Sequence, residues 1–150
     1  MATISTTPTA TSLAISDTTS KSGTISWTCP TLPVGSTITS CVLTGTPTFS
    51  MNRGKATVTV NGTSVSDGVQ FTINLGTSNT TKSVNTTGRG NNRNSSGTIT
   101  FTSLSYTVTY EEPVTKTENI MVGTSTVQTI YLGTTEIVRV YIGDTLVYGE

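Results

Sequence analysis

Very few side chains in this chain could take part in catalysis. The 150 residues include no histidine, eight Lys or Arg, eight Asp or Glu, and two cysteines. Without histidine the commonest general base is missing, and Ser-His and Cys-His nucleophile pairs cannot form. Glu111 and Glu112 are adjacent at the expected end of a strand, so their side chains point to opposite faces and cannot act as a pair. We therefore expect no enzymatic activity and no cofactor.

The two cysteines, Cys29 and Cys41, flank the connection between two expected strands. They could meet across that strand pair, but synthesis in a cytosol favours reduced, packed thiols over a disulfide. A structural metal site needs about four ligands, and the chain offers neither histidine nor a third cysteine. We expect free thiols and no bound metal.

The most polar segment of the chain also carries several of its cations. It reads TSNTTKSVNTTGRGNNRNSSG, with Val84 as its only large apolar residue, which predicts a long loop that is functional or mobile. Its cations Lys82, Arg89 and Arg93 either contact an anionic surface or a glycan at the tip of the domain, or are simply solvated. The segment lacks the ending of a phosphate-binding loop, and the single tryptophan is expected in the core. Nucleic acid is therefore not an expected partner.

The elements that must position these residues are β-strands. Thr and Ser account for 55 residues, and the branched Thr side chain favours pleated structure over helix. The segments GTISWTC, KATVTV, GVQFTINLG and TITFTSLSYTVTY alternate apolar and polar residues with a period of two. Asn61-Gly62 predicts a two-residue hairpin turn. In the last segment the alternation changes parity near Thr102-Ser103, which predicts a β-bulge.

About six short strands separated by turn signals, with no helical periodicity, predict an all-β fold, namely an antiparallel β-sandwich of jelly-roll type. We expect residues 1–20 to form a Thr/Ser-rich arm, either a flexible leader or an edge strand along a neighbour. Residues 21–112 should form the sandwich body, residues 113–120 a linker and residues 121–150 a small C-terminal β repeat. No signal peptide is visible, and no apolar run approaches the roughly 20 residues that span a bilayer. The sequence predicts a soluble protein without a membrane partner.

The charges divide unevenly along the chain. Residues 1–110 contain six Lys or Arg against two Asp or Glu, whereas residues 111–150 contain two against six. Such a division favours head-to-tail contacts between copies, although sparse charges also segregate by chance.

The C-terminal segment repeats with a period of ten residues. Glycine recurs at Gly123, Gly133 and Gly143, each after an aliphatic residue and before Thr or Asp. Strand alternation places apolar side chains on both faces, and three short strands cannot supply two covering layers themselves. We expect this segment to dock on the body, on other copies of the chain or on a partner. The predicted contact residues are Ile130, Tyr131, Leu132, Ile137, Val138, Val140, Tyr141, Ile142 and Tyr148.

The tail YLGTTEIVRVYIGDTLVYGE resembles the closing segments of structural proteins from tailed bacteriophages. The body, from SWTCPTLPVGSTITSCVLTGT to GTITFTSLSYTVTYE, is similar to β-sandwich modules of phage head-decoration, head-fibre and tail-appendage proteins. The resemblance implies a non-catalytic virion protein made in the host bacterial cytoplasm, either an auxiliary capsid (decoration) protein or a head fibre. Its partners would be other virion proteins of the capsid or tail, and it would form a homo-oligomer, a trimer being one option.

The alternative is a carbohydrate- or receptor-binding module of a phage tail or head appendage, whose partner is a host-surface glycan. Sugar sites usually present exposed aromatic rings. The aromatic residues available for this role are Tyr106, Tyr110 and the three tyrosines of the tail, Tyr131, Tyr141 and Tyr148.

Overall fold

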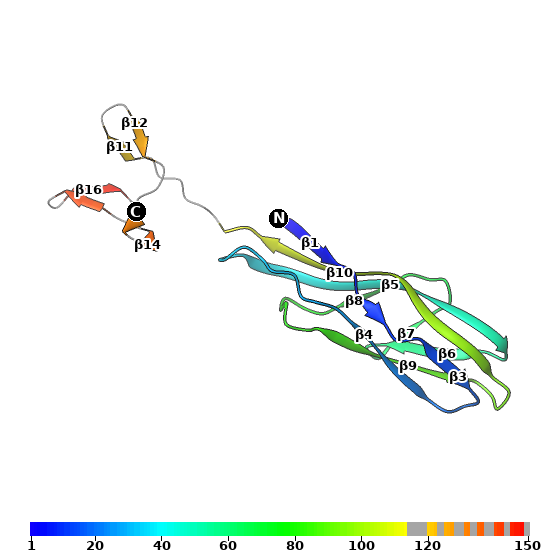
Figure 1. Cartoon of the computed structure of the whole chain (residues 1–150). Helices are drawn as coiled ribbons and strands as arrows, with labels where there is room; N and C mark the ends of the chain where they lie inside the picture. The colour runs from blue at the N-terminus through cyan, green and yellow to red at the C-terminus, as the bar shows by residue number, and fades with distance from the viewer. Residues whose placement is uncertain are drawn as a thin grey trace. The chain divides into compact units, whose positions relative to one another are not determined.

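A computed structural model describes residues 1–113 without a gap and the ranges 120–122, 125–127, 131–132, 135–136, 140–142 and 145–148 (Figure 1). The chain divides into two compact units, Met1–Pro113 and Val114–Glu150. The described residues form strands and turns only, so the all-β class predicted from the sequence is confirmed.

One sheet of the Met1–Pro113 unit, sheet I, has five strands: β1 (Ala2–Thr6), β3 (Leu13–Ser16), β5 (Thr37–Arg53), β8 (Phe71–Asn74) and β10 (Ser96–Glu111). The long strands β5 and β10 lie antiparallel at its centre. β8 pairs with the middle of β5, while β1 and β3 pair with the two halves of β10. All these pairings are antiparallel, and the strand order is β1-β10-β5-β8. β3 also pairs with β10, next to β1 on the same edge of the sheet.

The facing sheet, sheet II, also has five strands: β2 (Thr9–Ala10), β4 (Lys21–Ser26), β6 (Ala56–Val60), β7 (Thr63–Val65) and β9 (Ser83–Gly90). Their order is β2-β4-β9-β6-β7, and again every pairing is antiparallel.

The connections between the two sheets wind the chain into a jelly roll. β3 pairs with β10, β4 with β9, β5 with β8, and β6 with β7, so the pairs nest inside one another along the sequence. Successive pairs belong alternately to sheet I and sheet II. A long hairpin wound in this way into two sheets is the jelly-roll topology. The predicted jelly-roll-like sandwich is therefore confirmed.

The core lies between the sheets and consists of the alternate residues of each strand. Its larger cluster includes Ile25, Leu43 and Tyr106, each 0% exposed. A second cluster, near the turn between β9 and β10, contains Leu13 and Ile99. Complete burial of one such aliphatic side chain stabilises the fold by about 1.5–3 kcal/mol. The body thus has an apolar core of its own.

The predicted turn and bulge both occur. The two residues between β6 and β7, Asn61 and Gly62, have φ values of 48° and 77°, the left-handed conformation that this hairpin turn requires. The register between β5 and β10 shifts between Thr102 and Ser105, and Ser103 has a φ of 50°. This bulge lets Ile99 and Tyr106, which differ in strand parity, both point into the core.

Residues 1–20, expected to form an arm, instead supply β1, β2 and β3 to the sandwich. Leu13 and Ile15 are 1% and 3% exposed, so this segment is part of the core. The body therefore begins at Met1 and not at residue 21. One further difference concerns Val69: the alternation of GVQFTINLG places it on the same, inward face as Phe71 and Ile73, but it lies in the loop before β8 and is 58% exposed.

The segment expected as one long polar loop contains β9, a central strand of sheet II. Its inward positions include Val84, Thr86 and Gly88, so its alternation is nearly invisible in a hydrophobicity pattern. A larger residue at Gly88 would crowd β3 of the facing sheet I, because a Cβ there would lie 3.0 Å from Cδ1 of Ile15. The polar composition thus concealed a buried strand.

The described residues of the Val114–Glu150 unit form three short hairpins: β11 (Ile120–Val122) with β12 (Ser125–Val127), β13 (Tyr131–Leu132) with β14 (Thr135–Glu136), and β15 (Val140–Ile142) with β16 (Thr145–Tyr148). Two residues join the strands of each hairpin, and the first is Gly123, Gly133 or Gly143. Glycine in the first position of a two-residue connection is typical of hairpins. Each ten-residue repeat therefore corresponds to one hairpin.

Candidate functional site at the tip of the sandwich

Three turns at one end of the sandwich gather most of the positive charge of the body. This end, the tip, consists of residues 17–20 between β3 and β4, residues 54–55 between β5 and β6, and residues 91–95 between β9 and β10 (Figure 1). Asp17 is the only carboxylate in the three turns. Five of the six Lys and Arg residues of the body lie in these turns or at the strand ends beside them: Lys21, Arg53, Lys55, Arg89 and Arg93.

The structure brings two of the three predicted loop cations to this tip. Arg93 lies in the turn between β9 and β10, and Arg89 lies near the end of β9, exposed and opposite Thr57. Lys82 immediately precedes β9, seven residues from Arg89. At about 3.3 Å per strand residue this separation is about 23 Å. Lys82 therefore lies at the opposite end of sheet II and does not belong to the tip.

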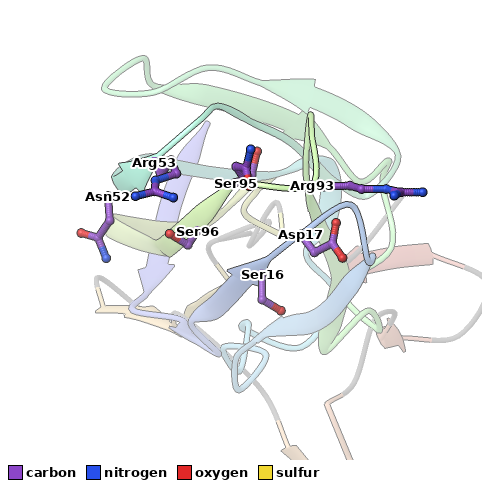
Figure 2. A pocket seen from close by; sticks show the side chains of 8 residues that line it. Ser16, Asp17, Asn52, Arg53, Arg93, Ser95 and Ser96 are labelled. Carbon is purple, nitrogen blue, oxygen red and sulfur yellow. The ribbon is translucent and has the colours of Figure 1, made fainter.

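An open hollow of about 420 Å³ lies between the turns. Figure 2 shows Asn52 and Arg53 on one side of it, Asp17 and Arg93 on the other and Ser95 between them; the guanidinium of Arg93 points away from Arg53. The hollow has no aromatic or aliphatic side chain in its lining, which suits a polar ligand. The lining residues are Ser16, Asp17, Asn52, Arg53, Arg93, Asn94, Ser95 and Ser96.

Ser95 ties the three turns together beneath the hollow. It is 2% exposed, and its Oγ donates a hydrogen bond to the carbonyl oxygen of Lys55 (3.0 Å) and accepts one from the Asn92 N–H (3.2 Å). Its own carbonyl oxygen accepts a hydrogen bond from the Asp17 N–H at 2.8 Å. The Asp17 carbonyl oxygen in turn accepts one from the Gly90 N–H at 3.1 Å. Because each turn is bonded to another, the hollow is already formed in the protein alone.

Two glycines permit this close approach. A Cβ at Gly90 would overlap the carbonyl oxygen of Asp17 and the side chain of Ser95, and a Cβ at Gly54 would lie 2.5 Å from Ser95 Oγ. Gly54 also has a φ of 70°, a conformation that other residues seldom adopt. The packing at the tip therefore depends on these two glycines.

Sequence reasoning did not identify Asp17 as part of this site. Its φ is 62°, and its Oδ1 accepts a hydrogen bond from the Thr18 N–H at 2.6 Å, a local bond that favours a turn at Asp. The polar run from Ser16 to Ser20, directly after Ile15, was the available signal for a turn. Its proximity to Arg93 follows only from the jelly-roll winding, which local patterns do not contain.

A second group of polar atoms is buried at the other end of the core. Tyr106 stacks on Trp27 with ring centroids 4.8 Å apart, and its hydroxyl donates a hydrogen bond to Asn79 Oδ1 at 2.9 Å. Asn79 Nδ2 donates to the carbonyl oxygen of Pro30 at 2.7 Å. Burial raises the pKa of Tyr106 well above its ordinary value, and the neighbouring Cys41 thiol raises it further. The hydroxyl therefore stays neutral and anchors the residue 79 loop.

The structure also answers two expectations about buried side chains. Cys29 and Cys41 are free thiols, as predicted. Tyr106 and Tyr110 are 0% and 8% exposed, so neither can stack on a sugar ring. The suggestion that these two tyrosines contact a glycan is contradicted by their burial.

The predicted contact residues of the C-terminal repeat fall into two groups. Ile130, Ile137 and Val138 lie outside the described residues. The others lie on hairpin strands: Tyr131 and Leu132 on β13, Val140, Tyr141 and Ile142 on β15, and Tyr148 on β16.

Within the described ranges, no three Cys, Asp or Glu side chains lie close enough together to hold a metal ion. The same residues include no helix with the length and apolarity needed to cross a membrane. Comparison of the chain with protein-family models, with curated proteins and with solved structures finds no significant match.

Proposed function

We propose that this chain is a non-catalytic structural protein of a tailed-bacteriophage virion, either an auxiliary capsid (decoration) protein or a head fibre. In this proposal the jelly-roll body is displayed on the particle, and the Val114–Glu150 unit joins it to other copies and to other virion proteins. The observation that carries the proposal is the row of three successive hairpins in that unit. The resemblance to phage structural proteins rests chiefly on the ten-residue repeat of these hairpins and, to a lesser degree, on the body.

The hairpins support a role in attachment because of their size. Each forms a two-stranded sheet of its own, with two to four residues per strand. An isolated two-stranded hairpin is marginally stable in water, whereas three or more strands with a covered apolar face are stable. Association with other copies of the chain would supply the covering surface, and closed symmetry makes a small homo-oligomer the expected product.

The body supports a role in display. Its two sheets close over their own core, and the jelly roll is an architecture shared by viral capsid and lectin domains. Many functions occur on one fold, so the jelly roll by itself does not select a virion role. The hairpins carry the proposal, and the fold of the body agrees with it.

The proposal is tested on particles from the phage or lysogenic bacterium whose genome carries this gene. After induction, particles are purified by density gradient and their proteins identified by mass spectrometry. We expect the full chain in the particle band, and we expect a chain shortened to Met1–Pro113 to remain in the unassembled protein fraction. Recovery of the full chain only in that unassembled fraction would contradict a structural role in the virion.

The carbohydrate- or receptor-binding alternative draws support from a different observation, the polar hollow at the tip. A displayed virion protein can also bind a glycan, so the two roles are compatible. The chemistry of the hollow decides which kind of ligand this would be.

A further inference from the structure

The tip combines a concentration of positive charge with guanidinium groups that are free to bind. Five cations and one carboxylate lie in the three turns or beside them, whereas the opposite end of the body has Lys82 with Glu111 and Glu112. Within residues 1–113, the hydrogen bonds that hold the tip together involve backbone groups and the side chains of Ser, Thr, Asp and Asn, and none uses Arg53 or Arg93. Both guanidiniums therefore keep their donors for a ligand.

The hollow presents a mixture of groups that matches a sugar bearing an acid group. Its two Asn amides and the hydroxyls of Ser16 and Ser96 can donate to and accept from hydroxyl groups, while the buried Ser95 hydroxyl is already used within the frame. The Asp17 carboxylate accepts hydrogen bonds only, which suits sugar hydroxyl donors. Arg53 and Arg93 can each bind a carboxylate or phosphate oxygen pair with two parallel hydrogen bonds. At about 420 Å³ the hollow lies within the range of small-molecule sites.

The same residues argue against two other ligand classes. The lining offers no aromatic ring, so neither a nucleobase nor the face of a neutral pyranose has a stacking surface. The carboxylate of Asp17 would repel a densely charged chain such as polyphosphate. A ligand with both hydroxyl groups and well-separated acid groups avoids these penalties.

The frame of the site is rigid enough to select such a ligand. Ser95 is buried and bonded to Lys55 and Asn92, and the Asp17 backbone is bonded to Ser95 and Gly90. A site formed before the ligand arrives loses less conformational freedom on binding. From these observations we propose that the tip hollow is a binding site for an acidic glycan, in which Arg53 and Arg93 bind the acid groups and Asp17, Asn52 and Asn94 bind the hydroxyls. This proposal is independent of where the protein assembles.

The test measures binding of the full chain to four polymers by isothermal titration calorimetry at low salt. Polygalacturonate carries carboxylates, its methyl ester is the matched neutral polymer, phosphomannan carries sugar phosphates, and polyphosphate is a polyanion without sugar. We expect binding to polygalacturonate, to phosphomannan or to both, and binding at least about tenfold weaker to the methyl ester and to polyphosphate. The proposal would be overturned if the protein bound neither polygalacturonate nor phosphomannan. It would also be overturned if polyphosphate bound as tightly as the acidic glycans.

Variants then locate the site on the molecule. The double variant Arg53→Ala with Arg93→Ala should weaken acidic-glycan binding at least about tenfold, while Lys82→Ala, which removes the cation at the opposite end, should leave it within about twofold. Asp17→Asn keeps a residue that tolerates positive φ, and it should weaken glycan binding while strengthening binding to polyphosphate. Urea unfolding of each variant checks that the body is intact. Unchanged glycan binding by the folded double variant would show that the hollow is not the site.

Discussion

The sandwich body and the C-terminal unit are both made of short antiparallel strands, yet they differ in what covers those strands. In the body, every strand belongs to one of two five-stranded sheets that face each other over buried side chains such as Leu43 and Tyr106. In the C-terminal unit, the described strands form three separate two-stranded sheets. The same local preference for β-structure thus produces a closed core in one region and separate hairpins in the other.

This difference shows that local β signals and independent stability are separate properties. In the C-terminal unit the glycines of the repeat directly follow β11, β13 and β15 in the sequence, and glycine at the start of a two-residue connection is typical of hairpins. The body is stabilised in addition by strand pairs between distant parts of the chain, such as β3 with β10 and β4 with β9. In our proposal the C-terminal unit obtains its missing contacts from other chains.

The largest effect should come from opening a cavity in the body. Leu43 is 0% exposed, and Leu43→Ala should lower the free energy of unfolding by about 2–5 kcal/mol. The matched change Leu132→Ala in the C-terminal unit should alter body unfolding by less than about 0.5 kcal/mol. Urea unfolding followed by the fluorescence of Trp27, the single tryptophan, measures both. Equal losses in the two variants would mean that the two regions share one core.

A smaller effect should follow from crowding the tip. Gly90→Ala places a Cβ against the Asp17 carbonyl and the Ser95 side chain, and it should cost about 1–3 kcal/mol. Gly76→Ala is the matched control, because Gly76 has a φ of 85° with open space around it and should cost about 1 kcal/mol. Thermal unfolding compares the two variants. Gly90→Ala should also weaken acidic-glycan binding. If the Gly90→Ala protein were as stable as the parent, the tight packing of the three turns would be contradicted.

A still smaller effect, about 1.4 kcal/mol, should appear over the first pH unit above about pH 10. Because burial raises the pKa of Tyr106 in the folded protein, the folded state retains a proton that the unfolded state loses above its ordinary pKa of about 10. The contribution of Tyr106 to the free energy of unfolding is therefore complete below about pH 10 and falls by about 1.4 kcal/mol per pH unit above it.

Urea unfolding of the parent and of Tyr106→Phe across this pH range tests the assignment to Tyr106. The variant should start about 1 kcal/mol less stable, through loss of the hydrogen bond to Asn79, and should show a flatter decline. Identical slopes would assign the alkaline loss to other groups.

Much of the fold could be predicted because its signals are local. The hairpin turn at Asn61-Gly62 and the bulge near Ser103 follow from residue types and from the parity of apolar positions, and both occur as predicted. The inward set Ile25 and Trp27 follows from simple alternation.

The features that were not predicted depend on contacts between distant segments. β9 is buried, but its inward positions hold small or polar residues such as Thr86 and Gly88, which carry no hydrophobic signal. The N-terminal strands gain their place by pairing with β10 and β4, more than a dozen residues away in sequence. The tip site has the same origin, because Asp17, Arg53 and Arg93 meet only through the winding of the jelly roll.

The most direct test of the central claim is the mass in solution of the full chain and of Met1–Pro113, by size-exclusion chromatography with light scattering. The body has its own core, so the shortened chain should fold and remain a monomer. Because the C-terminal unit is proposed to join copies of the chain, the full protein should have a mass that is a small multiple of 15.7 kDa. A full chain that remains at 15.7 kDa, or a shortened chain that still associates, would contradict the claim that residues 114–150 hold the copies together.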